Sequence, residues 1–260
     1  MKLSGLIREI LTFLVPKGCV ACGGWISAAD AELVCVMCRG RLPRASWPRC
    51  GRCHHPTGTG RTVQDDCLEC RGWPETIDVA RYAAILSHPA DHLVHALKYE
   101  GWQELAGFMG REIAECLRDE TSQAAIAGRR VVIVPTPTTT ARVRARGYNQ
   151  AASLAESVGA VLHVPVRDVV RRASGASSQT ALTPEQRREN VRGVFRLGPG
   201  ARSALDGVTV FLVDDVLTTG ATAGEVSTVL RSAGAARVVV ATFARALPRV
   251  TARNGGRRAA

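Results

Sequence analysis

Apolar residues along the chain gather in short unbroken runs, with stretches of helical spacing between them. The runs at 77–86, 130–135, 208–213 and 237–243 are rich in Val, Ile, Ala and Phe. Their length and composition predict strands, and the most apolar of them are typical of strands buried on both faces, as in a parallel sheet. Further strands are predicted at 164–170 and 191–197. Helices are predicted over 91–116 in two segments joined at 99–101, over 150–158 and over 223–232.

The run at 208–213 leads into the most informative stretch of the chain, VTVFLVDDVLTTGAT. We expect the strand to end at Asp214 and Asp215, followed by a Thr- and Gly-rich turn and a helix. Backbone N–H groups at such a turn bind phosphate, and Gly220 would let a ligand approach closely. The two carboxylates suit sugar hydroxyls, so the stretch indicates a phosphorylated ribose. The alternative is an Asp-rich turn that only caps the helix. No G-x-x-x-x-G-K-[ST] motif supports an ATPase.

Eight of the nine cysteines form four C-x-x-C pairs near the N-terminus: Cys19/Cys22, Cys35/Cys38, Cys50/Cys53 and Cys67/Cys70. Two such knuckles complete a tetrahedral four-sulfur site, so the pattern predicts two structural zinc ions. Disulfides are the alternative, although nothing indicates secretion. The near-equal spacers favour sequential pairing of knuckles into two ribbons over a cross-brace that joins the first to the third.

A hydroxyl- and arginine-rich stretch follows the strand at 130–135. It begins with Thr136 and Pro137, and Arg142, Arg144 and Arg146 follow at alternate positions. Guanidinium groups bind phosphate oxygens in pairs, so the stretch fits the diphosphate end of a ligand. A solvated basic loop is the alternative.

Two further basic positions are candidates for anion binding. Lys98 lies at the junction of two predicted helices, where it caps a helix or reaches an anion. Arg171 and Arg172 begin a Gly- and Ser-rich loop that runs to residue 178. That loop is interpreted either as a lid over a reactive ligand or as a mobile surface loop.

Composition limits the class of protein. The chain has 260 residues, 46% hydrophobic content and a mean hydropathy of +0.01, which argues against disorder and against a membrane protein. Its net charge of +11 fits phosphate-rich ligands or nucleic acid. The alternative is that the charge reflects the base composition of the genome, because only three of the basic residues are lysine.

We predict an amphipathic helix at 1–18 rather than a signal peptide, a double zinc ribbon at 19–73, a second domain at 77–248 and a basic disordered tail at 249–260. A cytoplasmic location is expected.

Taken together, these motifs resemble the ComF family within the type I phosphoribosyltransferases. The resemblance rests on the cysteine module and on five motifs: LKYEG at 97–101, VPTP at 134–137, RxRxRGYNQ at 142–150, QxxLxxxxRxxN at 179–190 and VDDVLTTGAT at 213–222. It implies a type I phosphoribosyltransferase fold, with a central parallel sheet flanked by helices and 5-phosphoribosyl 1-diphosphate (PRPP) at the C-terminal edge of the strands.

The resemblance also implies a role for each part of the site. Asp214 and Asp215 would bind the ribose 2′- and 3′-hydroxyls, and Thr136, Pro137 and Arg142 would line the diphosphate side with Mg²⁺. Catalysis would stabilise the departing pyrophosphate, so the expected catalytic residues are Arg144, Arg146, Arg171 and Arg172. The expected PRPP contacts further include Lys98 and the loop Leu217, Thr218, Thr219, Gly220, Ala221 and Thr222, which would hold the 5-phosphate.

Three functional hypotheses follow. The first is a PRPP-binding competence factor in DNA uptake, with single-stranded DNA and a competence helicase as candidate partners. The second is a metabolic phosphoribosyltransferase whose acceptor the sequence does not identify. The third is a zinc-ribbon adaptor with a vestigial PRPP site.

Overall fold

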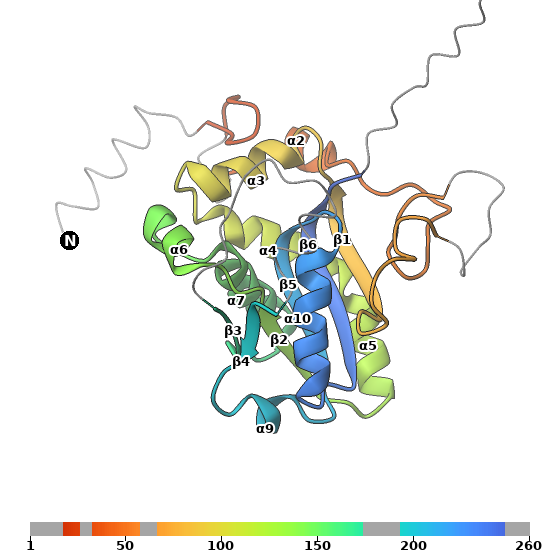
Figure 1. The fold of residues 1–260 in the computed structure, drawn as a ribbon. Helices are drawn as coiled ribbons and strands as arrows, with labels where there is room; N and C mark the ends of the chain where they lie inside the picture. The colour runs from red at the N-terminus through yellow and green to blue at the C-terminus, as the bar shows by residue number, and fades with distance from the viewer. Residues whose placement is uncertain (1–17, 27–32, 58–66, 174–192, 248–260) are drawn as a thin grey trace, which may run out of the picture.

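A four-stranded parallel sheet forms the centre of the molecule. The computed structural model describes residues 18–26, 33–57, 67–173 and 193–247. The strands are β1 (Val79–Ile85), β2 (Val131–Pro135), β5 (Thr209–Leu217) and β6 (Arg237–Arg245), in the order β1-β6-β5-β2 and all parallel (Figure 1). The strands predicted at 77–86, 130–135, 208–213 and 237–243 and their parallel arrangement are therefore confirmed.

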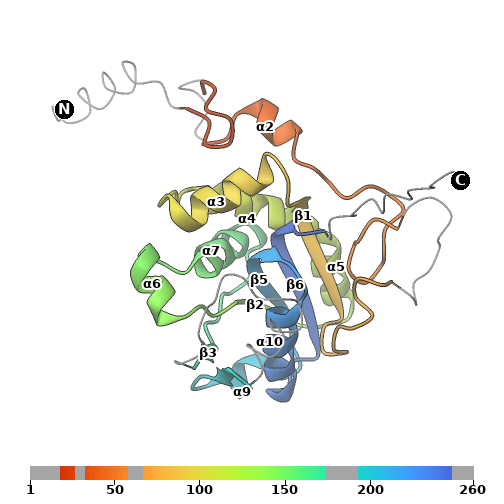
Figure 2. The same ribbon diagram turned by 45° about the horizontal axis from the view of Figure 1, so that its top comes forward.

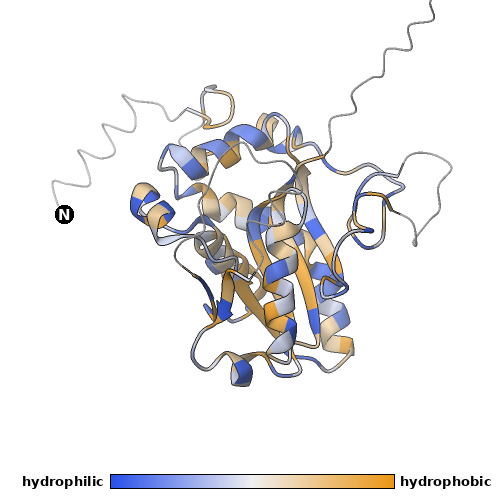
Figure 3. Cartoon of the chain, in the orientation of Figure 1, coloured by the Kyte–Doolittle hydropathy of each residue, from blue (hydrophilic) through white to orange (hydrophobic). Residues whose placement is uncertain are grey.

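Both faces of this sheet are covered, because alternate side chains of each strand point to opposite sides. Phe211 and Val213 belong to one core, with α3 (Ala90–Tyr99), α4 (Leu105–Cys116) and α7 (Gln150–Leu162). Val210 and Leu212 belong to a second core, with α9 (Ala201–Leu205) and α10 (Ala221–Ser232). Figure 1 shows α10 in front of the sheet and α4 and α7 behind it, and Figure 3 shows the apolar strands between them.

Several predicted elements differ from the observed ones. β5 continues to Leu217, so Asp214 and Asp215 lie inside the strand rather than after it. The basic stretch after Thr139 is not a loop but the helix α6 (Thr140–Arg146), because the Thr139 hydroxyl caps it by accepting from the Arg142 N–H at 3.2 Å. Gly147, with a φ of 86°, ends it.

The strand predicted at 164–170 is wrong in its position. Within it, Val166 forms only an isolated bridge to Ile133 beside Pro165, which has no N–H to donate. The strand starts later, as β3 (Val170–Arg172), and pairs antiparallel with β4 (Phe195–Leu197). Arg171 and Arg172 are therefore strand residues, not the start of a loop.

Besides α6, three of the described helices were not predicted: α2 (Val36–Gly40), α5 (Arg118–Ile126) and α9. They are short, and α5 has a polar sequence without an apolar stripe. The predicted N-terminal helix, the loop at 174–178, the motif at 179–190 and the basic tail lie outside the described residues. None of the described helices has the length and apolarity that crossing a membrane requires.

The two cysteine-rich segments pack in different places. Figure 2 shows the first, which includes α2, beside α3, and the second beside β1. Cys19, Cys38 and Leu42 of the first belong to the core with α3 and α4. Cys53, Cys70 and Trp73 of the second belong to the core with α10. Each segment is therefore anchored on its own face of the sheet.

Candidate functional site

The C-terminal ends of β2 and β5 open into a polar cavity of about 200 Å³. This is the edge at which ligands bind in open parallel sheets. Nine of the residues singled out in the sequence line it: Lys98, Thr136, Pro137, Arg142, Arg146, Arg172, Asp214, Asp215 and Thr222. The fold thus brings together side chains from four separate motifs and from β3.

The two adjacent carboxylates in this cavity have different environments. Asp215 is 7% exposed and its Oδ2 lies 2.9 Å from Lys98 Nζ, so its charge is paired. Lys98, expected to contact the ligand anion, lines the cavity and forms this ion pair. Burial, and then the charge of Asp215, raise the pKa of Asp214 to about 7, although Lys98 partly opposes the rise. Asp214 therefore titrates near neutral pH, beside the ion-paired Asp215.

The raised pKa of Asp214 predicts a dependence of stability on pH. The folded state holds a proton that the unfolded chain releases near pH 4, so stability is lost as the pH rises from about 4 to 7. We expect Asp214→Asn, which cannot ionise, to be more stable than wild type at pH 8 by on the order of 1–3 kcal/mol. Urea unfolding of both proteins at pH 8 and pH 4.5 measures this.

The excess stability of the variant should shrink at pH 4.5, where wild-type Asp214 is protonated. Asp168→Asn is the control, since Asp168 is exposed and pairs with Arg171 on the surface. Equal stability of Asp214→Asn and wild type at pH 8 would contradict the assigned pKa shift.

Helix geometry selects which arginines face the cavity. Arg142 and Arg146 are four residues apart on α6 and share a face, whereas Arg144 lies on the opposite side and is exposed. Arg146 donates to Gln150 Oε1 at 3.0 Å, and its guanidinium lies 5.0 Å from the Tyr99 ring centroid. Arg144, which was expected to be catalytic, therefore lies outside the cavity.

Strand geometry makes the same selection on β3, where successive side chains alternate. Arg172 lines the cavity and lies over the Phe195 ring at 5.4 Å. Arg171 points elsewhere and pairs with Asp168 Oδ2 at 2.5 Å. Of the four arginines expected to be catalytic, Arg146 and Arg172 line the cavity and Arg144 and Arg171 do not.

The expected phosphate loop is divided between different surroundings. Thr222 lines the cavity with the two aspartates, whereas Thr219, Gly220 and Ala221 line a second cavity of about 520 Å³ on the side of Trp73. Leu217 is buried at 3% exposure in the core, and Thr218 is exposed. The loop residues thus separate two cavities, and Leu217 is a core residue.

Gly220 is required for a reason that the sequence did not reveal. Its φ is +80°, and a Cβ there would lie 2.6 Å from Trp73 Nε1. The Trp73 indole therefore occupies the space that a side chain at position 220 would need. The positive φ is a second reason for glycine, because glycine adopts it without strain.

Five cavity residues were absent from the predicted site: Tyr99, Thr138, Asn149, Gln150 and Ala151. Asn149 is the N-cap of α7, where its Oδ1 accepts from the Ala151 N–H at 3.2 Å. Its Nδ2 donates to the Thr136 carbonyl at 3.4 Å, which joins α7 to the end of β2. An Asn directly before a predicted helix is a capping signal that could have marked this position.

The eight clustered cysteines form two four-cysteine sites. Ligand atoms of Cys19, Cys22, Cys35 and Cys38 lie within 4.8 Å of one another, and so do those of Cys50, Cys53, Cys67 and Cys70. All eight are free thiols, with 3.9 Å between the Sγ atoms of Cys22 and Cys35 and 3.7 Å between those of Cys53 and Cys67. Sequential pairing is therefore confirmed, and the disulfide and cross-brace alternatives are wrong. A tetrahedral set of four thiolates is the usual structural zinc site.

Residues 109–256 match the model of the phosphoribosyl transferase domain family. The chain belongs to this family. Competence protein F of Haemophilus influenzae is 28% identical over 232 residues, covering 88% of this chain and 96% of that protein. The DNA utilization protein YhgH of Escherichia coli K12 is 29% identical over 231 residues, covering 82% and 97%. Competence protein ComFC of Bacillus subtilis is 26% identical, covering 74% and 75%. The protein is thus a member of the ComF family.

Solved structures of phosphoribosyltransferases align over about half of the chain. Adenine phosphoribosyltransferase of Saccharomyces cerevisiae aligns with a TM-score of 0.34 and 14% identity, over 53% of this chain and 68% of that one. The PRPP amidotransferase of B. subtilis aligns with a TM-score of 0.33 and 20% identity, over 52% of this chain but only 25% of that one.

Proposed function

We propose that this ComF-family protein binds PRPP together with Mg²⁺ in the cavity at the ends of β2 and β5. The observation that carries the proposal is the meeting of two carboxylates with three arginines in one cavity. Asp214 and Asp215 suit ribose hydroxyls, and Arg142, Arg146 and Arg172 suit a diphosphate. The family relationship supports the same ligand.

The donors in the cavity also fit Mg²⁺, which prefers carboxylate and other oxygen ligands. Asp214, Asp215 and Thr136 are the residues that would hold it. The ion would neutralise negative charge on the diphosphate. The chain's own arginines would orient the diphosphate by paired hydrogen bonds, and the first N–H groups of α10 would face the 5-phosphate.

Calorimetric titration of PRPP with Mg²⁺ into the wild-type protein tests the ligand. We expect saturable binding of one PRPP per chain. Ribose 5-phosphate and pyrophosphate should each compete, because each fills part of the same cavity. Absence of PRPP binding would overturn the proposal and would favour the zinc-ribbon adaptor with a vestigial site.

We further propose a role in the handling of transforming DNA in the cytoplasm. The names of the relatives, "Competence protein F" and "DNA utilization protein", support it, as does the net charge of +11. Reduced, clustered thiols are typical of an intracellular protein. Single-stranded DNA and a competence helicase are the proposed partners.

Direct contact with DNA predicts a strong dependence on salt. If six to ten phosphates are contacted, affinity for a single-stranded oligonucleotide should fall by roughly 10²- to 10⁴-fold between 50 and 200 mM salt, because binding releases counterions from the strand. Fluorescence anisotropy of a labelled oligonucleotide across that range measures the slope. A flat dependence would argue that the basic residues do not contact the DNA backbone.

Transferase turnover is a second candidate function. It is favoured by Arg146 and Arg172, which lie where they could stabilise a departing pyrophosphate. Release of pyrophosphate from PRPP on addition of nucleobases or amines would show turnover. Tight PRPP binding without release under any of these conditions would leave PRPP as a regulatory ligand.

A further inference from the structure

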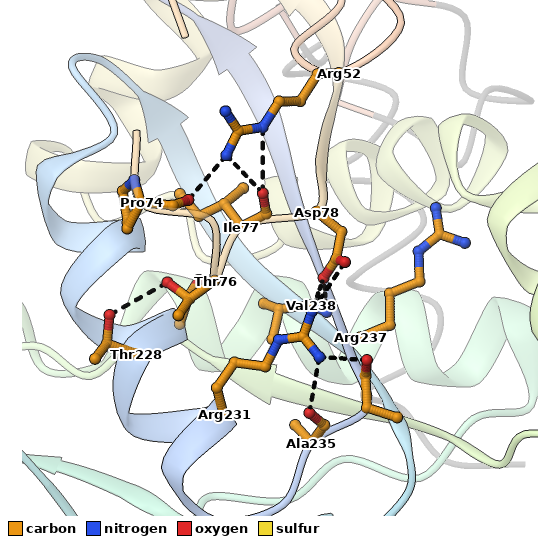
Figure 4. A network of polar contacts seen from close by, with 12 residues as sticks. Arg52, Pro74, Thr76, Ile77, Asp78, Thr228, Arg231, Ala235, Arg237 and Val238 are labelled. Atoms are coloured by element: carbon orange, nitrogen blue, oxygen red, sulfur yellow. Dashed lines mark hydrogen bonds and ion pairs between the residues drawn. The ribbon is translucent and has the colours of Figure 1, made fainter. Parts of the chain in front are cut away.

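A short connecting segment, residues 73–78, joins the second four-cysteine site to the sheet and lies along α10. Four contacts pair the segment with the helix in order, from its N-terminal loop to its last turn. Trp73 Nε1 donates to the Thr219 carbonyl at 3.0 Å, Pro74 packs on Gly224, Thr76 and Thr228 hydroxyls are 3.2 Å apart, and Asp78 accepts twice from Arg231 Nη2 at 2.9 Å. Figure 4 shows the last of these pairs beside the helix.

The second cysteine site holds this segment through Arg52, which lies between the two thiols of the knuckle Cys50 to Cys53. Its guanidinium donates to the carbonyls of Pro74 at 2.8 Å and Ile77 at 2.9 Å (Figure 4). It also donates to the carbonyl of Cys70 at 3.1 Å. The direction of Arg52 depends on the turn that the knuckle adopts. Metal site, Arg52 and connecting segment thus form one connected unit.

Trp73 is the end of this unit that reaches the expected phosphate loop. It is 6% exposed, whereas Trp25, Trp47 and Trp102 are 39% exposed or more. The guanidinium of Arg245 lies 5.1 Å from its ring centroid, and that arginine is itself 1% exposed. The indole therefore lies close to both a buried cation and the Gly220 backbone.

The position of Trp73 matters because the N-cap residue of α10, Gly220, has no side chain to accept from the first turn of the helix. The Ala221 N–H donates to Thr219 Oγ1 at 3.4 Å, so the N–H groups of Thr222 and Ala223 are those left for a ligand. Trp73 contacts the loop from the second cavity, while Thr222 faces the cavity with Asp214 and Asp215. A hydrogen bond to the Thr219 carbonyl fixes the peptide plane that precedes these N–H groups.

We infer that Trp73 is a positioning residue for the phosphate loop, and that the second four-cysteine site maintains it there. The first site packs in the core with α3 and α4 on the other face of the sheet, so it does not have this role. The inference rests on the proposed binding of PRPP and concerns the 5-phosphate end of that ligand.

Titrations of ligand fragments into Trp73→Phe test the positioning role. Phenylalanine keeps the aromatic ring but removes the Nε1–H donor. We expect the affinity for ribose 5-phosphate to fall about fivefold, the effect of one hydrogen bond, while pyrophosphate binds as in wild type. A general loss of structure would lower the affinity for both ligands alike. Trp102→Phe is the matched control, because Trp102 is partly exposed outside both cavities.

Each result of this titration has a definite meaning. Unchanged affinity of Trp73→Phe for ribose 5-phosphate, or an equal loss for both fragments, would overturn the inference and leave PRPP binding intact. Failure of the wild type to bind PRPP or either fragment would instead overturn the proposed function, and the inference with it.

A second comparison tests the part played by the metal site. Cys53→Ser and Cys22→Ser each remove one thiol, the first from the second site and the second from the first site. We expect only Cys53→Ser to lower the affinity for ribose 5-phosphate, by fivefold or more. Arg52→Gln keeps all eight thiols and should show the same selective loss even if Cys53→Ser fails to fold. Wild-type affinity in Arg52→Gln would overturn the coupling.

Discussion

The double variant Asp214→Asn and Asp215→Asn is expected to weaken PRPP binding by about 10²- to 10⁴-fold. Hydrogen bonds to charged groups contribute about 1.5–3 kcal/mol each, and about 1.4 kcal/mol corresponds to a tenfold change in affinity. Asparagine preserves the shape of both side chains but removes the carboxylates that would accept from ribose hydroxyls or hold Mg²⁺. Calorimetric titration of PRPP with Mg²⁺ measures the change.

Asp168→Asn is the control for this experiment, since Asp168 is an exposed carboxylate outside the cavity. It should bind PRPP like wild type. Circular dichroism should show that the double variant remains folded, because the Asp215 ion pair with Lys98 is near the surface of the cavity rather than in the core. Wild-type affinity in the folded double variant would rule out the proposed role of the two acids.

The purified protein is expected to hold two zinc ions per chain, and their removal is expected to unfold both cysteine-rich segments. Structural zinc contributes roughly 10–16 kcal/mol of apparent binding free energy per site in small domains, which these short segments cannot replace with a core of their own. Elemental analysis gives the zinc content. Thermal unfolding before and after treatment with a strong chelator gives the loss of stability.

Single cysteine variants test which cysteines hold the zinc ions. Cys22→Ser and Cys53→Ser should each lower the zinc content by up to one ion per chain. Cys116→Ser should keep two, because the ninth cysteine lies on α4 outside both sites. A zinc content near zero in freshly purified wild type would contradict the assignment, and loss of zinc from Cys116→Ser would contradict the ligand sets.

The structure corrects the sequence-based site most clearly at the arginines. From the sequence alone, the alternate positions Arg142, Arg144 and Arg146 look equivalent. The helix α6 gives them a period of 3.6 residues instead, so Arg142 and Arg146 face the cavity and Arg144 does not. The Thr139 cap that starts this helix could be recognised only once its partner N–H was in place.

Long-range contacts account for the other differences. Lys98 meets Asp215 across more than a hundred residues of sequence, and Trp73 meets Thr219 across 146. Propensity and periodicity describe neighbours along one element and contain no information about such pairs. The raised pKa of Asp214 has the same origin, since it depends on burial and on Asp215 together.

The sequence by itself determined the buried parallel strands, the four cysteine knuckles and the likeness to the ComF family. Each of these is written in local patterns: unbroken apolar runs, fixed C-x-x-C spacing and contiguous motifs. Only the tertiary structure decided how the knuckles pair, which arginines share a cavity with Asp214 and Asp215, and that Trp73 lies against Gly220. Those features depend on which surfaces pack together, and packing joins residues that are far apart in the chain.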